Sequence, residues 1–222
     1  MPHERDLIQE QIDYYRRKAP EYDASAAQGD DPLVAHGREI DRALDAFRPA
    51  GRVLEIACGT GNQTRRLLEH ASELTAVDSS SEAMELARKK LGDDPRIRFI
   101  EADIFSWNPE ERYDVVFFGW WLCHVPPERF DRFWDLVRRA LKPGGRVFFE
   151  DEFENAFNDE FIAAQSLPLV RRTTSDGSTY RVVKVFWDPA ELETRLRGLG
   201  WDIEIHTTGP FYWGEGHRSS PG

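Results

Sequence analysis

The sequence predicts an α/β fold in which a parallel sheet carries helices on both faces. From Arg52 onward, short runs rich in β-branched and aromatic residues alternate with stretches of helical periodicity, the pattern of strands joined by crossover helices. The first run leads into a loop of small residues at 57–61 and then into a helical stretch. The unbroken apolar run 113–118 is typical of a strand that is covered on both faces.

Composition narrows the class of protein. The chain has 222 residues, of which 40% are hydrophobic, enough to fill one compact core. Its 29 basic and 40 acidic residues give a formal charge of -11, the wrong sign for a protein that neutralises nucleic-acid phosphates or anionic lipids. The most apolar stretch, 115–125, is far shorter than the roughly 20 residues that cross a bilayer. The start lacks a secretory pattern and there are only two cysteines, so we expect a cytoplasmic protein with no membrane and no nucleic-acid partner.

The predicted core contains five strands in chain order. We expect them at 53–56, 74–77, 97–100, 113–118 and 146–149. Helices are expected between them at 63–70, at 83–90 and from Pro126-Pro127 to Val137, the last ending before Pro143-Gly144.

The flanking segments predict further elements. Residues 1–48 look helical, with a polar gap at 28–31. A turn at 175–178 precedes the β-rich stretch 179–186, which predicts an added β-hairpin before the last helix at 189–199. Strands are expected at 201–206 and 211–214, the latter as the last edge strand.

The loop 57–61 is the strongest functional signal. A P-loop needs Gly-Lys-Ser/Thr, and this loop contains no lysine. A dinucleotide fingerprint needs a third small residue where Thr64 stands. The remaining interpretation is a cofactor without phosphates at the carboxyl ends of the strands, where ligands of parallel sheets bind.

Several motifs in the same order resemble the class I S-adenosylmethionine-dependent methyltransferases. They are Glu55 with the 57–61 loop, Asp78 after the second strand, and the segments 101–104, 113–118, 141–145 and 14–23. The resemblance implies one methyltransferase domain, 1–222, built on a Rossmann-like sheet. Within it we expect a helical lid (1–48), a cofactor-binding core (49–150) and the acceptor side with the carboxyl-terminal strands (151–222). It implies S-adenosylmethionine (SAM) as cofactor and S-adenosylhomocysteine (SAH) as product. The implied cofactor contacts are Tyr15, Tyr22, Glu55, Ala57, Gly59, Gly61, Asp78, Ser79, Ala102, Asp103, Ile104, Phe118 and Gly119.

Individual roles follow from the family. Asp78 would accept hydrogen bonds from the ribose hydroxyls, and Asp103 from the adenine amine. Ala57 replaces the usual first glycine, a change expected to cost little. Both aspartates also suit helix caps, and the tyrosines of 14–23 also suit the core face of a helix.

The acceptor side leaves more open. His124 follows the fourth strand and is the candidate general base, although a histidine there is also typical of a structural residue at the start of the next helix. His124, Glu150 and Asp151 could hold a divalent cation such as Mg²⁺, with a solvated run of charge as the alternative. Similarity of the carboxyl-terminal part extends to phosphonate O-methyltransferases of antibiotic biosynthesis and to mycobacterial O-methyltransferases of methylmannosides.

These two kinds of relative imply different acceptors. A phosphonate would bind paired cations from Arg171, Arg172, Arg181 and Lys184, and a sugar would bind aromatic platforms and carboxylates. Because the chain is acidic, we expect a sugar hydroxyl on a small polar metabolite, with a phosphonate or carboxylate oxygen, or a non-catalytic SAM-binding module, as alternatives. The sequence is compatible with a homodimer and does not decide the oligomeric state. The expected substrate contacts are Trp120, Trp121, Glu150, Asp151, Arg171, Arg181 and Lys184.

Overall fold

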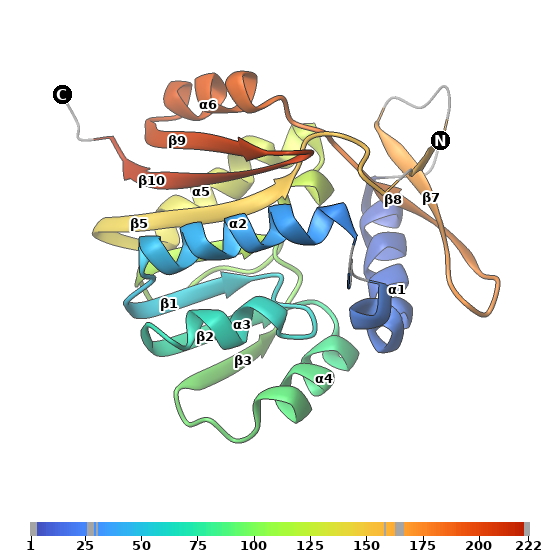
Figure 1. The fold of residues 1–222 in the computed structure, drawn as a ribbon, viewed down its shortest axis with the longest axis horizontal. Helices are drawn as coiled ribbons and strands as arrows, with labels where there is room; N and C mark the ends of the chain where they lie inside the picture. The colour runs from blue at the N-terminus through green and yellow to red at the C-terminus, as the bar shows by residue number, and fades with distance from the viewer. Residues whose placement is uncertain (1–3, 26–28, 30, 158, 163–166, 220–222) are drawn as a thin grey trace.

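The structure is a computed structural model that describes residues 4–25, 29, 31–157, 159–162 and 167–219. Its main sheet has seven strands in the order β3 (Ile97–Glu101), β2 (Ala71–Asp78), β1 (Gly51–Ile56), β4 (Tyr113–Gly119), β5 (Leu141–Glu152), β10 (Phe211–Arg218) and β9 (Trp201–Thr208). The first five are parallel, and β10 is antiparallel to both of its neighbours (Figure 1). The predicted α/β fold is confirmed.

Helices cover both faces of this sheet because alternate strand residues point to opposite sides. Leu54 and Phe118 pack with α5 (Phe130–Ala140) and α6 (Pro189–Gly198). Val53 and Phe117 pack with α2 (Pro32–Phe47), α3 (Asn62–Leu67) and α4 (Ser81–Leu91). Short turns, η1 (Asp23–Ser25), η2 (Leu122–His124) and η3 (Pro127–Arg129), connect these elements.

A second, three-stranded sheet stands beside the carboxyl ends of the main strands. It contains β6 (Glu160–Phe161), β7 (Leu169–Thr173) and β8 (Thr179–Val183), and α1 (Glu4–Tyr22) packs against β8 (Figure 1). The added hairpin is therefore present as β7 and β8. Helix α1 lies across the carboxyl edge of the sheet, and from here on we call α1 with η1 the lid. Helix α2, which the sequence grouped with it, packs on the sheet face instead.

The prediction of 211–214 as an edge strand is wrong. Strand β10 runs to Arg218 and lies between β5 and β9, so that β9 forms the edge. Glycines at 214 and 216 hide this strand in the sequence, because they supply no side-chain alternation. They are needed there: a Cβ at Gly214 would lie 2.3 Å from the Phe149 ring. Within the described residues, no helix combines the length and apolar character needed to cross a membrane.

Candidate active site

The loop after β1 turns sharply at the carboxyl edge of the sheet. Gly59 has a φ of 52° and Gly61 a φ of 80°, the left-handed region that glycine adopts freely. A Cβ at Gly59 would meet nothing within 4 Å, so this backbone is open to a ligand. At Gly61 a Cβ would lie 2.9 Å from Ala87 of α4, which explains that glycine by packing. Ala57 also has a positive φ, of 57°, so replacing glycine there carries strain that we did not expect.

Asp78 ends β2 directly beside this loop. Its Oδ2 accepts the amide N–H of Gly59 at 2.8 Å, and its Oδ1 accepts that of Ser80 at 2.8 Å. Burial raises the pKa of the carboxyl group, against these hydrogen bonds. The neighbouring Ser79 offers its carbonyl to Arg16 of α1 at 2.9 Å. The loop and the acid are thus locked together.

The segment 102–104 lies beside Asp78. The amide of Ala102 donates to the carbonyl of Asp78 at 2.8 Å, and Ile104 is buried. Asp103 Oδ1 accepts the amide of Phe105 at 3.0 Å, so one carboxylate oxygen stabilises the local turn. This arrangement fits a nucleoside across the ends of β1 and β2, with Gly59, Asp78 and Asp103 within one region.

Three of the other expected cofactor residues, Glu55, Phe118 and Gly119, are explained by packing within the sheet. Glu55 is buried, accepts the Thr64 hydroxyl at 2.6 Å, and has its pKa raised to about 8 by that burial. Phe118 is buried and stacks on Phe149, so only its backbone can contact a ligand. Gly119 has no room for a side chain, since a Cβ would lie 2.7 Å from Glu150 Oε1.

Helix α1 and η1 close over this edge. Asp23 accepts the Thr60 hydroxyl at 2.6 Å, the Asn62 amide at 3.0 Å and the Lys90 ammonium at 2.7 Å. These donors come from the glycine loop, α3 and α4. One carboxylate therefore ties the end of the lid to three elements around the expected cofactor.

His124 lies under the same helix. Its Nδ1–H donates to the carbonyl of Val183 at 2.7 Å, which leaves Nε2 to accept the Tyr15 hydroxyl at 2.7 Å. Burial, together with the charges of Lys184 and Arg172, holds the pKa of His124 well below its usual range. Burial also raises the pKa of Tyr15 well above its usual range and that of Tyr22 to about 12. His124 is therefore a neutral acceptor, and its basic nitrogen is occupied by Tyr15.

Beneath these rings lies a buried polar cluster. Lys184 forms an ion pair with Glu152 and lies 3.4 Å from Cys123 Sγ. Burial would lower the pKa of Lys184, but the neighbouring Cys123, Glu152 and Asp151 hold it above its ordinary value. Glu152 Oε2 is buried without a hydrogen-bond partner among the described residues. The sequence offered Glu152 in the carboxylate run at the end of the fifth strand, but its pairing with Lys184 was not predicted, because the two residues lie in separate segments of the chain.

The arginines of the second sheet lie on different faces of that sheet, and they do not all face the site. Arg172 is partly buried near Tyr14 and Tyr15 and pairs with Asp159 at 2.9 Å. Arg171, predicted to touch the acceptor, is exposed and pairs with Glu160 at 3.1 Å. Arg181 is held by Glu10 of α1. Strand alternation explains why Arg172, rather than Arg171, faces the site.

The predicted metal ligands do not come together. Glu150 and Asp151 are adjacent in β5 and point to opposite faces: Glu150 accepts Gln63 of α3 at 2.9 Å, whereas Asp151 accepts the amide of Cys123 at 2.8 Å. Both nitrogens of His124 are already hydrogen-bonded. The trio of His124, Glu150 and Asp151 is therefore not a cation site, and the prediction of a divalent cation there is not supported.

The two tryptophans expected beside the acceptor are partly buried and pack against the core on opposite faces of the sheet. Trp120 meets Phe211 edge-on, with ring centroids 5.0 Å apart, on the α2 face of the sheet. Trp121 packs near Phe105, with ring centroids 5.6 Å apart, on the other face. Because the two rings lie on opposite faces of the sheet, they do not form a shared surface on which a sugar could stack.

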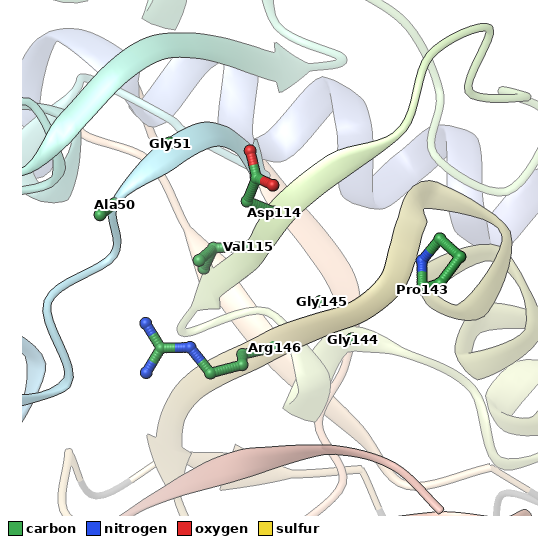
Figure 2. A pocket seen from close by; sticks show the side chains of 8 residues that line it. All are labelled: Ala50, Gly51, Asp114, Val115, Pro143, Gly144, Gly145 and Arg146. Atoms are coloured by element: carbon green, nitrogen blue, oxygen red, sulfur yellow. The ribbon is translucent and has the colours of Figure 1, made fainter. Parts of the chain in front are cut away.

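A hollow of about 400 Å³ lies at the opposite, amino-terminal edge of the strands. Figure 2 shows Asp114 and Arg146 beside it. Lys142 neutralises Asp114 at 2.8 Å, and Arg146 donates to the carbonyl of Phe47 at 3.1 Å. This hollow is remote from Asp78 and from His124, so its size does not make it the active site.

Comparison with known proteins bears on the chemistry. A family profile described as a methyltransferase domain matches residues 53–145. The chain is 39% identical over 99 residues to malonyl-[acyl-carrier protein] O-methyltransferase 1 of Ilyobacter polytropus, a match covering 44% of this chain and 36% of that protein. It is 37% identical over 100 residues to trans-aconitate 2-methyltransferase of Rhizobium leguminosarum, covering 42% and 36%. The chain thus spans about a third of the length of these curated relatives.

One solved structure matches along nearly its whole length. The DhpI–SAH complex is 37% identical, with a TM-score of 0.83, over 97% of this chain and 98% of that one. A DhpI–SAM–HEP complex matches with the same values. The open Gly59 backbone beside Asp78 fits the nucleoside that these complexes contain. The chain therefore belongs to the class I S-adenosylmethionine-dependent methyltransferases.

Proposed function

We propose that this methyltransferase methylates an acidic oxygen, of a phosphonate or a carboxylate, on a small metabolite. The observation that carries the proposal is that two partly or fully buried cations, Lys184 and Arg172, lie under α1 beside the His124 and Tyr15 pair, each held by one carboxylate, Glu152 and Asp159. An anion bound there would gain charge-assisted hydrogen bonds in a buried setting, where such bonds are strong.

Other features support an acidic oxygen over the sugar hydroxyl expected from the sequence. The two tryptophans expected as sugar platforms, Trp120 and Trp121, are partly buried and pack against different hydrophobic clusters on opposite faces of the sheet, so they do not form a single platform. Two curated relatives are named for acids, malonyl-[acyl-carrier protein] and trans-aconitate, and the carboxyl-terminal part of the chain resembles phosphonate O-methyltransferases.

The reaction asks mainly for positioning. Bound SAM supplies an electrophilic methyl group. The acceptor oxygen forms a bond to the methyl carbon as the bond from carbon to sulfur breaks, so the two must be collinear. An ionised oxygen has no proton to lose, and the chain's task is then to orient it. Lys184 and Arg172 would hold the anion, while Tyr15, fixed by His124, would exclude water above it.

A hydroxyl acceptor is the second candidate, favoured by the hydrogen bond from Tyr15 to His124. A hydroxyl that displaced Tyr15 would face the lone pair of Nε2, and His124 would take its proton. The two candidates differ in whether catalysis needs a base.

Methyl transfer from labelled SAM to a panel of phosphonates, carboxylates and methylmannosides tests the proposal. We expect turnover with acids, and loss of acid turnover in Lys184→Met while SAH binding is retained. Arg171→Met, which removes the exposed neighbouring cation, is the matched control and should keep its activity. Exclusive turnover of neutral sugars would contradict the proposal.

A further inference from the structure

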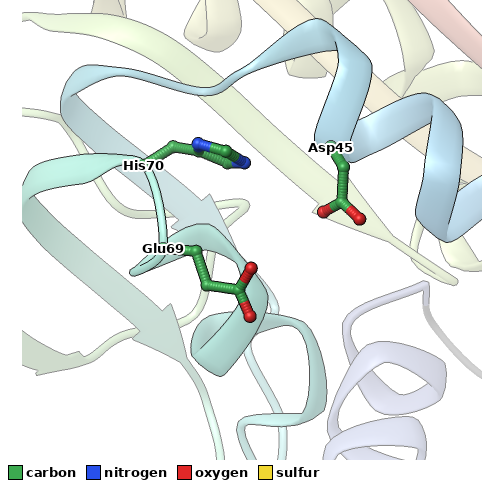
Figure 3. A group of neighbouring side chains, drawn as sticks. All are labelled: Asp45, Glu69 and His70. Carbon is green, nitrogen blue, oxygen red and sulfur yellow. The ribbon is translucent and has the colours of Figure 1, made fainter.

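A group of three possible metal ligands lies at the amino-terminal edge of the sheet, away from helix α1. Asp45 belongs to the last turn of α2, and Glu69 and His70 join α3 to β2. One ligand atom from each of the three residues lies within 4.8 Å of the other two. Figure 3 shows the three side chains pointing into the space between α2 and the end of α3.

Two of these side chains have polar atoms that nothing satisfies. Asp45 Oδ1 and His70 Nε2 are both buried, and neither has a hydrogen-bond partner among the described residues. A buried polar atom without a partner is costly and rare in native proteins. An acceptor oxygen and an imidazole nitrogen with a free lone pair can both be satisfied at once by a cation between them.

The surrounding charges also favour a cation. Arg66 pairs with Asp45 Oδ2 at 2.8 Å and with Asp41 at 3.1 Å. Glu69 adds a third carboxylate to this group, so three carboxylates stand against one guanidinium. The Arg66 contact also holds the Asp45 carboxylate through Oδ2 and leaves Oδ1 without a partner, as outer-shell contacts fix a metal ligand.

We propose that Asp45, Glu69 and His70 bind a divalent transition metal, with Zn²⁺ as the best match. One imidazole and two carboxylates suit zinc, whereas Mg²⁺ and Ca²⁺ prefer oxygen ligands alone. Three protein ligands leave one position for water. Because the ligands come from α2 and from the connection between α3 and β2, the ion joins two parts of the chain and raises stability. It does not take part in methyl transfer.

Titration of Zn²⁺ into tag-free protein, in competition with a chromophoric chelator, tests this site. We expect one equivalent per chain, a rise in the thermal midpoint with zinc, and no comparable effect of Mg²⁺. His70→Gln and Asp45→Asn should each weaken binding by at least about tenfold. The matched controls, which should keep zinc affinity, are Asp41→Asn, which removes an acid that pairs with Arg66 and Gln63 but is no proposed ligand, and His36→Gln, a histidine bonded to Thr208.

A third variant distinguishes this site from the buried group formed by Cys123, Asp151 and Glu152. Cys123→Ser should leave zinc affinity unchanged. Stoichiometric binding that survives His70→Gln, binding lost in Cys123→Ser, or no binding by the wild-type protein would each overturn the proposal. Because every readout is binding or stability, the result is independent of the acceptor proposed above.

Discussion

At the scale of single residues, the site is defined by which hydrogen-bond partner each group already has. His124 donates from Nδ1 and accepts at Nε2, so its tautomer and its orientation are both fixed before any substrate binds. Before His124 can accept a proton from a substrate, its hydrogen bond with the Tyr15 hydroxyl must break. For an acidic acceptor, the pair acts as a positioning device.

Substitution of Tyr15 separates these roles. With an acidic acceptor, we expect Tyr15→Phe to lower kcat by about fivefold, because about 1 kcal/mol of orienting hydrogen bond is lost. The rate should stay flat between pH 6 and 9. The measurement is kcat against pH for the wild type and the variant. A rate that rises steeply with pH in the wild type would instead indicate a base and a hydroxyl acceptor.

The pH dependence of stability tests whether Glu150 lies buried beside Gln63, away from the acceptor. Burial first, then Asp41, raises its pKa from 4.5 to about 8. The folded protein therefore keeps a proton that the unfolded chain releases above about pH 5. The free energy of unfolding should fall, as pH rises from 5 to 8, by up to about 1.4 kcal/mol per unit from this group.

Glu150→Gln should remove its share of that slope and stabilise the protein at pH 8. Urea unfolding at pH 5, 6, 7 and 8 measures the effect, and Glu154→Gln, lying in the loop beyond β5, is the control. Methyl transfer should persist. Loss of turnover at full SAH affinity would return Glu150 to the acceptor site.

At the scale of elements, the loop after β1 carries measurable strain. Ala57 has a φ of 57°, where an L-residue costs about 1–2 kcal/mol relative to glycine. The greater flexibility of an unfolded glycine offsets about 0.5–1 kcal/mol. Ala57→Gly should therefore raise the free energy of unfolding by about 0.5 kcal/mol. Denaturant melts measure it, and Ala43→Gly within α2 should lower stability. A destabilised Ala57→Gly would contradict the strained geometry.

The tie between η1 and the sheet predicts how the lid opens. Asp23→Ala removes the acceptor for Thr60, Asn62 and Lys90, so the lid should open about tenfold more often. Hydrogen exchange of α1 reports this opening, and we expect it to quicken while the sheet stays protected. Asp13→Ala, which loses only a contact with Gln9, is the control. Unchanged exchange in α1 would show that other contacts hold the lid.

Elements were predictable where local pattern determines them, and the missed features depend on pairing. The strands of the core were expected from apolar runs, but β10 was placed wrongly because its glycines are explained only by neighbours such as Phe149. Arg172 was named among four candidate cations, but that it rather than Arg171 faces the site was missed for a related reason, as was the contact of Glu152 with Lys184. Which face a strand residue takes depends on where the strand ends and on its register, and neither is local.

At the scale of the whole molecule, the sheet brings two regions together under one helix. The carboxyl ends of β1 and β2 form the nucleoside region, and those of β4 and β5 lie beside the polar cluster around Lys184. Helix α1 contacts both, through Arg16 at Ser79 and Tyr15 at His124. The expected nucleoside region was predictable because each of its motifs is a short run at the end of a strand. The cluster was not, since Cys123, Glu152 and Lys184 meet only in the folded chain.

Calorimetric titration of SAH into Asp78→Ala tests the location of the nucleoside most directly. Loss of two hydrogen bonds to a charged acceptor, each about 1.5–3 kcal/mol, predicts affinity at least about a hundredfold weaker than in the wild type. Asp202→Ala, on the edge strand β9, should bind SAH normally. Wild-type affinity in a folded Asp78→Ala protein would contradict the account.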